Sequence, residues 1–162
     1  FNPAIPLSHE TTATEILEDF GVDLGAVICT TGTGGTVSGI SPILRSAIPD
    51  IQIIVTEPDE SPMLSQGIGR KHRIMGTTPS FIPDTLDQNA YDSIISVNAD
   101  DAIGITRRLA EEEGIFCGIS CGAAIVGMLE YAKQEEAKDK QLLAILADTG
   151  ERYLSTELWT SI

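Results

Sequence analysis

The chain has 162 residues, enough for one ordinary domain, and its 42% hydrophobic and 21% charged residues are the balance of a packed globular core. Ten lysines and arginines against 24 aspartates and glutamates give a formal net charge of −14. That charge repels a phosphate backbone, so we expect no nucleic-acid partner. No apolar run approaches the roughly 18 residues of a membrane span, so we expect no membrane association.

Cysteine usage and the first residues bear on the compartment. Cys29, Cys117 and Cys121 are an odd number without CxxC spacing or histidine partners, which predicts neither disulfides nor a metal site. A reducing cytoplasm fits this pattern. The opening residues lack the parts of a signal peptide. They also lack an initiator Met, so we expect that the chain begins inside a longer one.

Short apolar runs alternate with helical stretches, which is typical of βαβ units and a mainly parallel sheet. The apolar runs predict strands at Ala26–Cys29, Gln52–Glu57, Ser93–Val97 and Leu142–Leu146. The stretches between and around them predict helices at Thr12–Phe20, Val37–Ala47, Ala99–Glu113, Gly122–Ala132 and Glu151–Trp159. From Pro58 to Asp92, prolines and glycines with little periodicity predict a long surface excursion, and loops of that length are often functional.

The strongest local feature is the sequence TGTGGT at residues 31–36, between a predicted buried strand and a predicted helix. Glycines let the backbone approach a ligand, and the amides at a helix N-terminus favour an anion such as phosphate. No Lys follows, as a Walker loop requires, and Val37 stands where a dinucleotide fingerprint needs Gly. The alternative interpretation is a glycine-rich turn that serves tight packing of strand and helix.

Three ordered stretches carry a resemblance to a known family. TGTGGT at 31–36 resembles the phosphate loop of fold type II pyridoxal-phosphate (PLP) enzymes, and GIFCGISCGAA at 114–124 is similar to their G-I-S-S-G-A segment. GERYLST at 150–156 matches the same stretch of cysteine synthases, also called O-acetylserine sulfhydrylases. Over essentially its whole length, the chain resembles the C-terminal half of that family. The resemblance implies an α/β fold, a mainly parallel twisted sheet with helices on both faces.

The resemblance also implies site residues. The PLP phosphate would be held by Gly32, Thr33, Gly34, Gly35 and Thr36. Ser120 would hydrogen-bond the pyridine nitrogen, and because its hydroxyl is neutral the ring would be a mild electron sink suited to replacement at the substrate's β carbon. A helix N-cap is the alternative role for Ser120.

Other positions depart from the family or stay unassigned. Cys121 stands where a second Ser is common, so its role stays open. Residues 74–83 resemble a family segment, QGIGAGFIP, that borders the substrate entrance; Met75 replaces its Gln, and Thr78 and Ser80 replace two glycines, which leaves the substrates open. The two histidines are interpreted as surface or loop polar residues, namely His9 and His72.

The family's Schiff-base lysine belongs to its N-terminal half, and none of the lysines here has the expected setting: Lys71, Lys133, Lys138 and Lys140. We therefore assign no catalytic residue. Residues 1–162 are expected to be the C-terminal PLP-phosphate-binding domain of a two-domain enzyme, inactive alone, whose N-terminal half is absent from this chain.

The activity that the resemblance implies is β-replacement of O-acetylserine with sulfide, which gives cysteine and acetate. Two alternatives stay open: a cystathionine β-synthase-like enzyme, and a non-catalytic regulatory module that retains the fold. The implied partners are a small amino-acid substrate, a second copy in a homodimer, and the C-terminal tail of serine acetyltransferase. The A-type or B-type assignment stays open.

Overall fold

The computed structural model describes residues 2–160, in which a parallel sheet of four strands is the central layer. The strands are β1 (Leu24–Thr30), β2 (Gln52–Pro58), β3 (Ser93–Val97) and β4 (Gln141–Ala144). Their spatial order is β3-β2-β1-β4, and every neighbouring pair is parallel. In register, Val27 of β1 lies beside Ile53 of β2 and Leu143 of β4.

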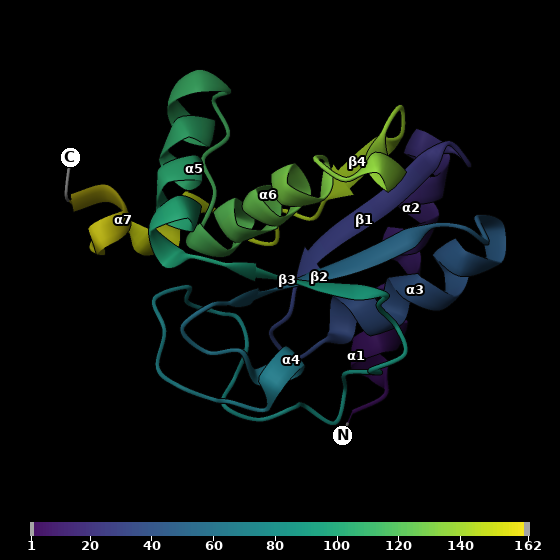
Figure 1. The fold of residues 1–162 in the computed structure, drawn as a ribbon, viewed down its shortest axis with the longest axis horizontal. Coiled ribbons are helices and arrows are strands. Elements are labelled where there is room, and N and C mark those ends of the chain that lie inside the picture. The colour runs from purple at the N-terminus through teal and green to yellow at the C-terminus, as the bar shows by residue number, and fades with distance from the viewer. Residues whose placement is uncertain (1, 161–162) are drawn as a thin grey trace.

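Helices cover both faces of this sheet (Figure 1). On one face lie α1 (Ala4–Leu7), α2 (Glu10–Phe20) and α3 (Gly35–Ala47); on the other lie α5 (Ala99–Glu112) and α6 (Ile119–Tyr131). The short elements are α4 (Met63–Gln66), α7 (Glu157–Thr160) and the 3-10 turns Glu135–Ala137 and Gly150–Tyr153. None of the helices within residues 2–160 is both long and apolar enough to cross a membrane.

The two faces of β1 bury different side chains. Val27 and Cys29 join the hydrophobic cluster formed with α2 and α3, whereas Ala26 and Ile28 join a cluster that includes Tyr131 of α6. Successive side chains of a strand point to opposite faces, so a strand covered on both sides is apolar throughout. The structure thus confirms the predicted α/β fold.

One predicted element is wrong. Residues 151–159 do not form a continuous helix, because the 3-10 turn Gly150–Tyr153 ends before a separate short α7 begins at Glu157. Thr156 accounts for the break: its hydroxyl donates to the Tyr153 carbonyl at 2.7 Å and accepts from the Leu158 amide at 3.3 Å. Such side-chain bonds compete with the backbone bonds of a helix.

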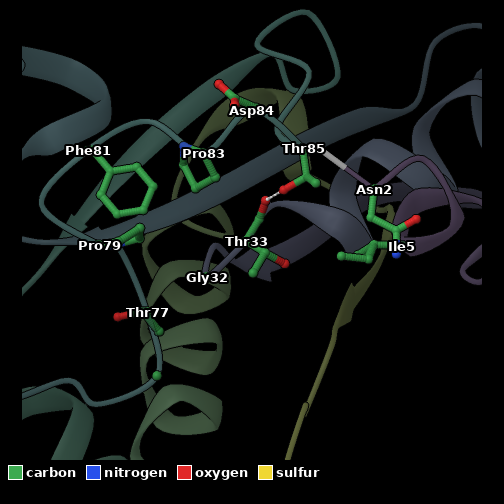
Figure 2. Close-up of a pocket in the computed structure, with 11 residues that line it drawn as sticks. Asn2, Ile5, Gly32, Thr33, Thr77, Pro79, Phe81, Pro83, Asp84 and Thr85 are labelled. Carbon is green, nitrogen blue, oxygen red and sulfur yellow. Dashed lines mark hydrogen bonds between the residues drawn. The ribbon is translucent and has the colours of Figure 1, made fainter.

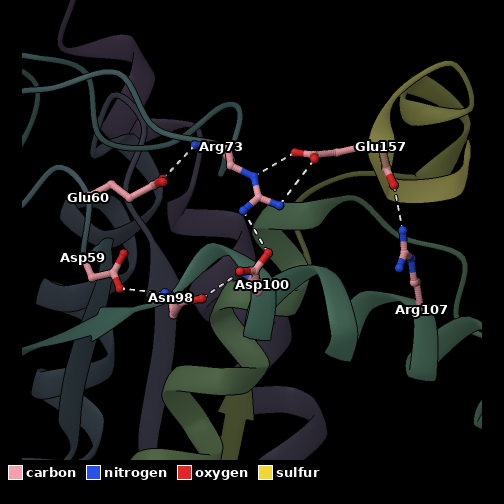
Figure 3. Close-up of polar contacts among 7 residues, drawn as sticks. All are labelled: Asp59, Glu60, Arg73, Asn98, Asp100, Arg107 and Glu157. Atoms are coloured by element: carbon pink, nitrogen blue, oxygen red, sulfur yellow. Dashed lines mark hydrogen bonds and ion pairs between the residues drawn. The ribbon is translucent and has the colours of Figure 1, made fainter. Parts of the chain in front are cut away.

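The predicted excursion between β2 and β3 is confirmed, with α4 as its one helix within the described residues. Buried Glu57, at the end of β2, anchors its start by accepting from the Leu64 amide at 2.8 Å and from the Ser65 hydroxyl. Farther along, Arg73 pairs with Asp100 of α5 at 2.8 Å and with Glu157 of α7 at 2.9 Å (Figure 3). The excursion is therefore fastened at both places to regular elements.

Candidate functional site

Strand order locates the site. The strand β1 has β2 on one side and β4 on the other, so the chain moves away from β1 in opposite directions. In parallel sheets, such a point leaves a crevice beyond the carboxyl ends of the strands, where ligands bind. The glycine-rich loop follows β1 and residues 145–149 follow β4, so both segments meet at this crevice.

The glycine-rich loop ends at the N-terminus of α3. Gly34 is the N-cap residue, in the left-handed conformation at φ 79°. Within residues 2–160, the amides of residues 32–37 donate no hydrogen bond to backbone or side chain. The first amides of a helix lack partners inside the helix, and the helix dipole adds positive potential at that end. A row of free amides there is suited to hold an anion.

Tight packing behind the loop also demands glycine. A Cβ at Gly34 would lie 2.6 Å from the Leu86 side chain, and one at Gly35 would lie 2.4 Å from Ile5. The alternative that the sequence left open, a turn kept for packing, is thus true of these positions as well. It does not compete with anion binding, because the packing atoms and the unpartnered amides are different groups.

All six residues predicted to bind the cofactor line one cavity of about 310 Å³. Its wall is formed by Thr30, Gly32, Thr33, Gly34, Gly35, Thr36, Val37, Gly76, Ser120, Ala147 and Asp148. Ser120 lies in the first turn of α6, whose N-cap residue is Gly118, so the structure rejects the N-cap alternative for Ser120. The loop and Ser120 belong to one concave site, of a size that small-molecule pockets have.

Side chains outside the cavity support the loop. His9 places its Nε2 3.3 Å from the Thr36 hydroxyl and its Nδ1 3.4 Å from the Thr12 hydroxyl, while the Thr85 hydroxyl donates to the Thr33 carbonyl. The sequence interpretation of His9 as a surface or loop polar residue missed this role. Nothing local signals it, because His9 and Thr36 are 27 positions apart.

Asp148 is the charged residue that sequence reasoning missed. It lies four residues after the end of β4 and lines the same cavity as Ser120. The available signal was its position, since polar residues at the carboxyl ends of parallel strands commonly contact ligands. The family-like stretch GERYLST starts two residues later, at Gly150, and does not include it.

A second cavity, of about 530 Å³, adjoins the first and shares Gly32, Thr33 and Gly76 with it (Figure 2). Its outer wall is largely apolar and comes from the segment that resembles the family's substrate entrance, with Pro79, Phe81 and Pro83. Among the described residues, Thr78 and Ser80 line neither cavity. Replacement of two family glycines by these residues therefore does not narrow either cavity directly.

Comparison with known proteins agrees with this geometry. Residues 1–148 match the family model described as "Pyridoxal-phosphate dependent enzyme". The chain is 47% identical over 165 residues to a probable cysteine synthase of Bacillus subtilis (strain 168), covering 99% of this chain and 53% of that protein.

Solved structures give the same picture. The crystal structure of O-acetylserine sulfhydrylase isoform 3 from Entamoeba histolytica is similar with a TM-score of 0.96 and 35% identity, over 99% of this chain and 48% of that one. An O-ureido-L-serine synthase structure gives a TM-score of 0.93 and 42% identity, over 99% and 51% of the two chains. The chain thus spans about half the length of the proteins it matches. It belongs to the family of pyridoxal-phosphate dependent enzymes.

Proposed function

We propose that the chain is the C-terminal part of a PLP-dependent cysteine synthase, which exchanges the acetate of O-acetylserine for sulfide and releases cysteine. The observation that carries the proposal is the row of unpartnered amides at residues 32–37, on the wall of a cavity that also contains Ser120. An anion-binding end and a hydroxyl in one cavity match the phosphate and the ring nitrogen of PLP. The similarity to cysteine synthases supports the activity.

In this proposal, the chain's own residues bind and orient the cofactor. The amides of Gly32 to Thr36 and the α3 dipole hold the phosphate, and the Ser120 hydroxyl contacts the ring nitrogen. PLP, when bound, supplies the electron sink for replacement at the substrate's β carbon. The second cavity, next to the loop, is the route by which the amino-acid substrate enters.

The reactive amine comes from outside these residues. Lys133 pairs with Glu130 at 2.6 Å and Lys138 with Glu135 at 3.6 Å, both on the surface. The Lys140 side chain packs over Gly25, and no lysine of the described residues lines the cavity. We therefore propose a two-domain enzyme in which residues 1–162 form the C-terminal, phosphate-binding domain and the other half supplies the lysine.

Finer parts of the proposal rest on the resemblance alone. They are a cytoplasmic location, a homodimer, and docking of the serine acetyltransferase C-terminal tail in the active-site cleft. The molecule that replaces the acetate differs among the similar structures, which include an O-ureido-L-serine synthase as well as O-acetylserine sulfhydrylases.

Reconstitution of the full-length protein with PLP tests the proposal. We expect cysteine from O-acetylserine and sulfide, whereas the 162-residue chain alone makes none. Homocysteine in place of sulfide tests the cystathionine β-synthase-like alternative. A full-length protein that binds PLP but accepts neither nucleophile would contradict the proposal and favour the regulatory module. Borohydride reduction that leaves a stoichiometric phosphopyridoxyl group on a lysine of the isolated chain would also contradict the proposal, because it would place the reactive amine in this half.

A further inference from the structure

Two carbonyl groups of the glycine-rich loop accept hydrogen bonds from the excursion between β2 and β3. The Thr33 carbonyl accepts from the Thr85 hydroxyl, a bond that is drawn in Figure 2. Two residues earlier, the Thr31 carbonyl accepts from the Thr78 amide at 2.5 Å. Alternate peptide units of the loop are therefore tied to the same excursion.

These ties set the direction of two loop amides. No peptide bond within residues 2–160 is cis, and in a planar trans peptide the N–H points opposite to the C=O. The bond from Thr85 to the Thr33 carbonyl thus turns the Gly34 amide away from Thr85. The bond from Thr78 does the same for the Gly32 amide. Both amides are among those that donate no hydrogen bond within the described residues.

The peptide between Thr33 and Gly34 lies at the boundary of the two cavities. Among the described residues, Thr85 lines the second cavity and not the first, whereas Gly34 lines the first and not the second. Thr33 lines both. The carbonyl is thus bonded on the side of the second cavity, and the amide of the same peptide is directed to the side where the phosphate is proposed to bind.

The segment that carries Thr85 is itself attached to the loop and to α3. The buried Leu86 side chain packs against Gly34, where a Cβ would lie 2.6 Å from it. The Asp87 amide donates to the Ser38 hydroxyl of α3 at 2.9 Å. Because packing and a second hydrogen bond hold the residues that follow Thr85, its hydroxyl is presented to the Thr33 carbonyl from a fixed position.

We propose that Thr85 is a positioning residue for the cofactor phosphate: by bonding the Thr33 carbonyl, its hydroxyl aims the Gly34 amide at the phosphate. The inference rests on the proposed function, since it requires PLP with its phosphate on the loop. Glycine accepts both positive and negative φ, so without this tie the peptide before Gly34 is free to rotate. The rotated peptide would point a carbonyl at the anion in place of an amide.

Loss of the Thr85 hydroxyl should weaken phosphate binding without unfolding the chain, because Thr33 is exposed and water can bond its carbonyl instead. The test compares PLP with pyridoxal, which lacks the phosphate, on the cofactor-free full-length protein. Thr85→Val removes the hydroxyl and keeps the shape, and we expect PLP to bind about five-fold more weakly, the effect of one ordinary hydrogen bond. Pyridoxal binding should be unchanged.

Three further variants make the test specific. Thr85→Ser keeps a hydroxyl and should bind PLP as the wild type does. Thr85→Ala lacks the hydroxyl and should repeat the loss, which guards against a folding defect in the valine variant. Ser38→Ala is the matched control, because it removes the bond to the Asp87 amide but leaves the Thr33 carbonyl tied. It should bind PLP like the wild type.

Three results would overturn the inference. They are equal PLP affinity in Thr85→Val and the wild type, a loss of equal size for PLP and pyridoxal, and a loss in Ser38→Ala as large as that in Thr85→Val. A full-length protein that takes up no PLP would defeat the proposed function together with the inference. One that takes up PLP but makes no cysteine would defeat the activity alone, while the PLP affinities still decide the role of Thr85.

Discussion

The Thr78 amide donates a hydrogen bond of 2.5 Å to the carbonyl of Thr31, the residue that begins the glycine-rich loop. Thr78 has φ 37° and is only 2% exposed, and its hydroxyl is one of a few buried polar atoms without a partner in the described residues. Left-handed backbone is rare for β-branched residues and costs about 1–3 kcal/mol. Backbone strain is thus stored directly against the glycine-rich loop.

Replacement of Thr78 by Gly should relieve that strain. We expect Thr78→Gly to raise the free energy of unfolding by about 1 kcal/mol, because glycine adopts positive φ freely and the unpartnered hydroxyl is removed. Asp139 is the matched control: it has φ 59° but is exposed, and aspartate tolerates this conformation better. Urea unfolding should show a smaller gain for Asp139→Gly. A loss of stability in Thr78→Gly would mean that the buried side-chain contacts outweigh the strain.

Gly34 is predicted to be intolerant of any side chain. Gly34→Ala should cost about 2 kcal/mol of unfolding free energy, because a left-handed alanine is strained and its Cβ would lie 2.6 Å from Leu86. It should also weaken phosphate binding, measured by isothermal titration. Gly104 in α5 has no atom within 4 Å of the corresponding Cβ, so Gly104→Ala should stabilise the protein by up to about 1 kcal/mol. Equal effects of the two substitutions would show that the loop conformation is not the constraint.

The sequence predicted well what local pattern determines. All four strands appear within two residues of their predicted ends, because β1 to β4 are short apolar runs between turns. The glycine-rich loop was recognisable for the same reason, since the loop and the strand and helix on either side of it are consecutive in the sequence.

Contacts between residues far apart in the sequence could not be predicted from the sequence. Asp148 and Cys121 are 27 positions apart, so only the folded chain shows that the carboxylate joins the turn of Ser120. Local competition explains two other differences. Thr156 bonds its own neighbours and interrupts the predicted C-terminal helix, while extended Gly118 is the N-cap of α6, which therefore starts at Ile119, three residues before the predicted Gly122.

Arg73 is predicted to hold the C-terminal segment to the body of the protein. Its guanidinium donates to Glu157 at 2.9 Å and to Asp100 at 2.8 Å, and its amide donates to Glu60 at 3.1 Å (Figure 3). Arg73→Ala should speed amide hydrogen exchange in α7 and lower the unfolding free energy by about 1 kcal/mol, since a network is worth more than one exposed pair.

Salt and a matched variant make the Arg73 prediction specific. The difference between wild type and Arg73→Ala should shrink in 1 M salt, because the side chain is 40% exposed and its charges are screened. Arg108 forms a single i,i+4 pair with Glu112 on α5, so Arg108→Ala should change stability by less than about 0.5 kcal/mol. An unchanged exchange rate in α7 after Arg73→Ala would show that the remaining contacts, which include hydrogen bonds from Arg107 to the Glu157 and Leu158 carbonyls, retain the segment.

We expect burial of the Cys29 thiol to lower the unfolding free energy at alkaline pH. Complete burial raises the pKa of its thiol from 9.0 to about 12, so the native state keeps this proton where the unfolded state loses it. A native state that binds more protons than the unfolded state loses stability as pH rises. Between pH 9 and 12 the unfolding free energy should therefore fall by up to about 1.4 kcal/mol per pH unit from this thiol alone.

Cys29→Ala isolates that contribution. The variant is less stable at pH 7, because the removal of a buried sulfur leaves a small cavity, but its unfolding free energy should decline less steeply from pH 8 to pH 10. Alkylation followed by mass analysis gives a second measurement: at pH 8 the native thiol is about one part in ten thousand thiolate, so Cys29 should react only at the rate of unfolding. Rapid labelling of Cys29 in the folded protein, or identical pH slopes in the two proteins, would show that β1 opens to solvent without global unfolding.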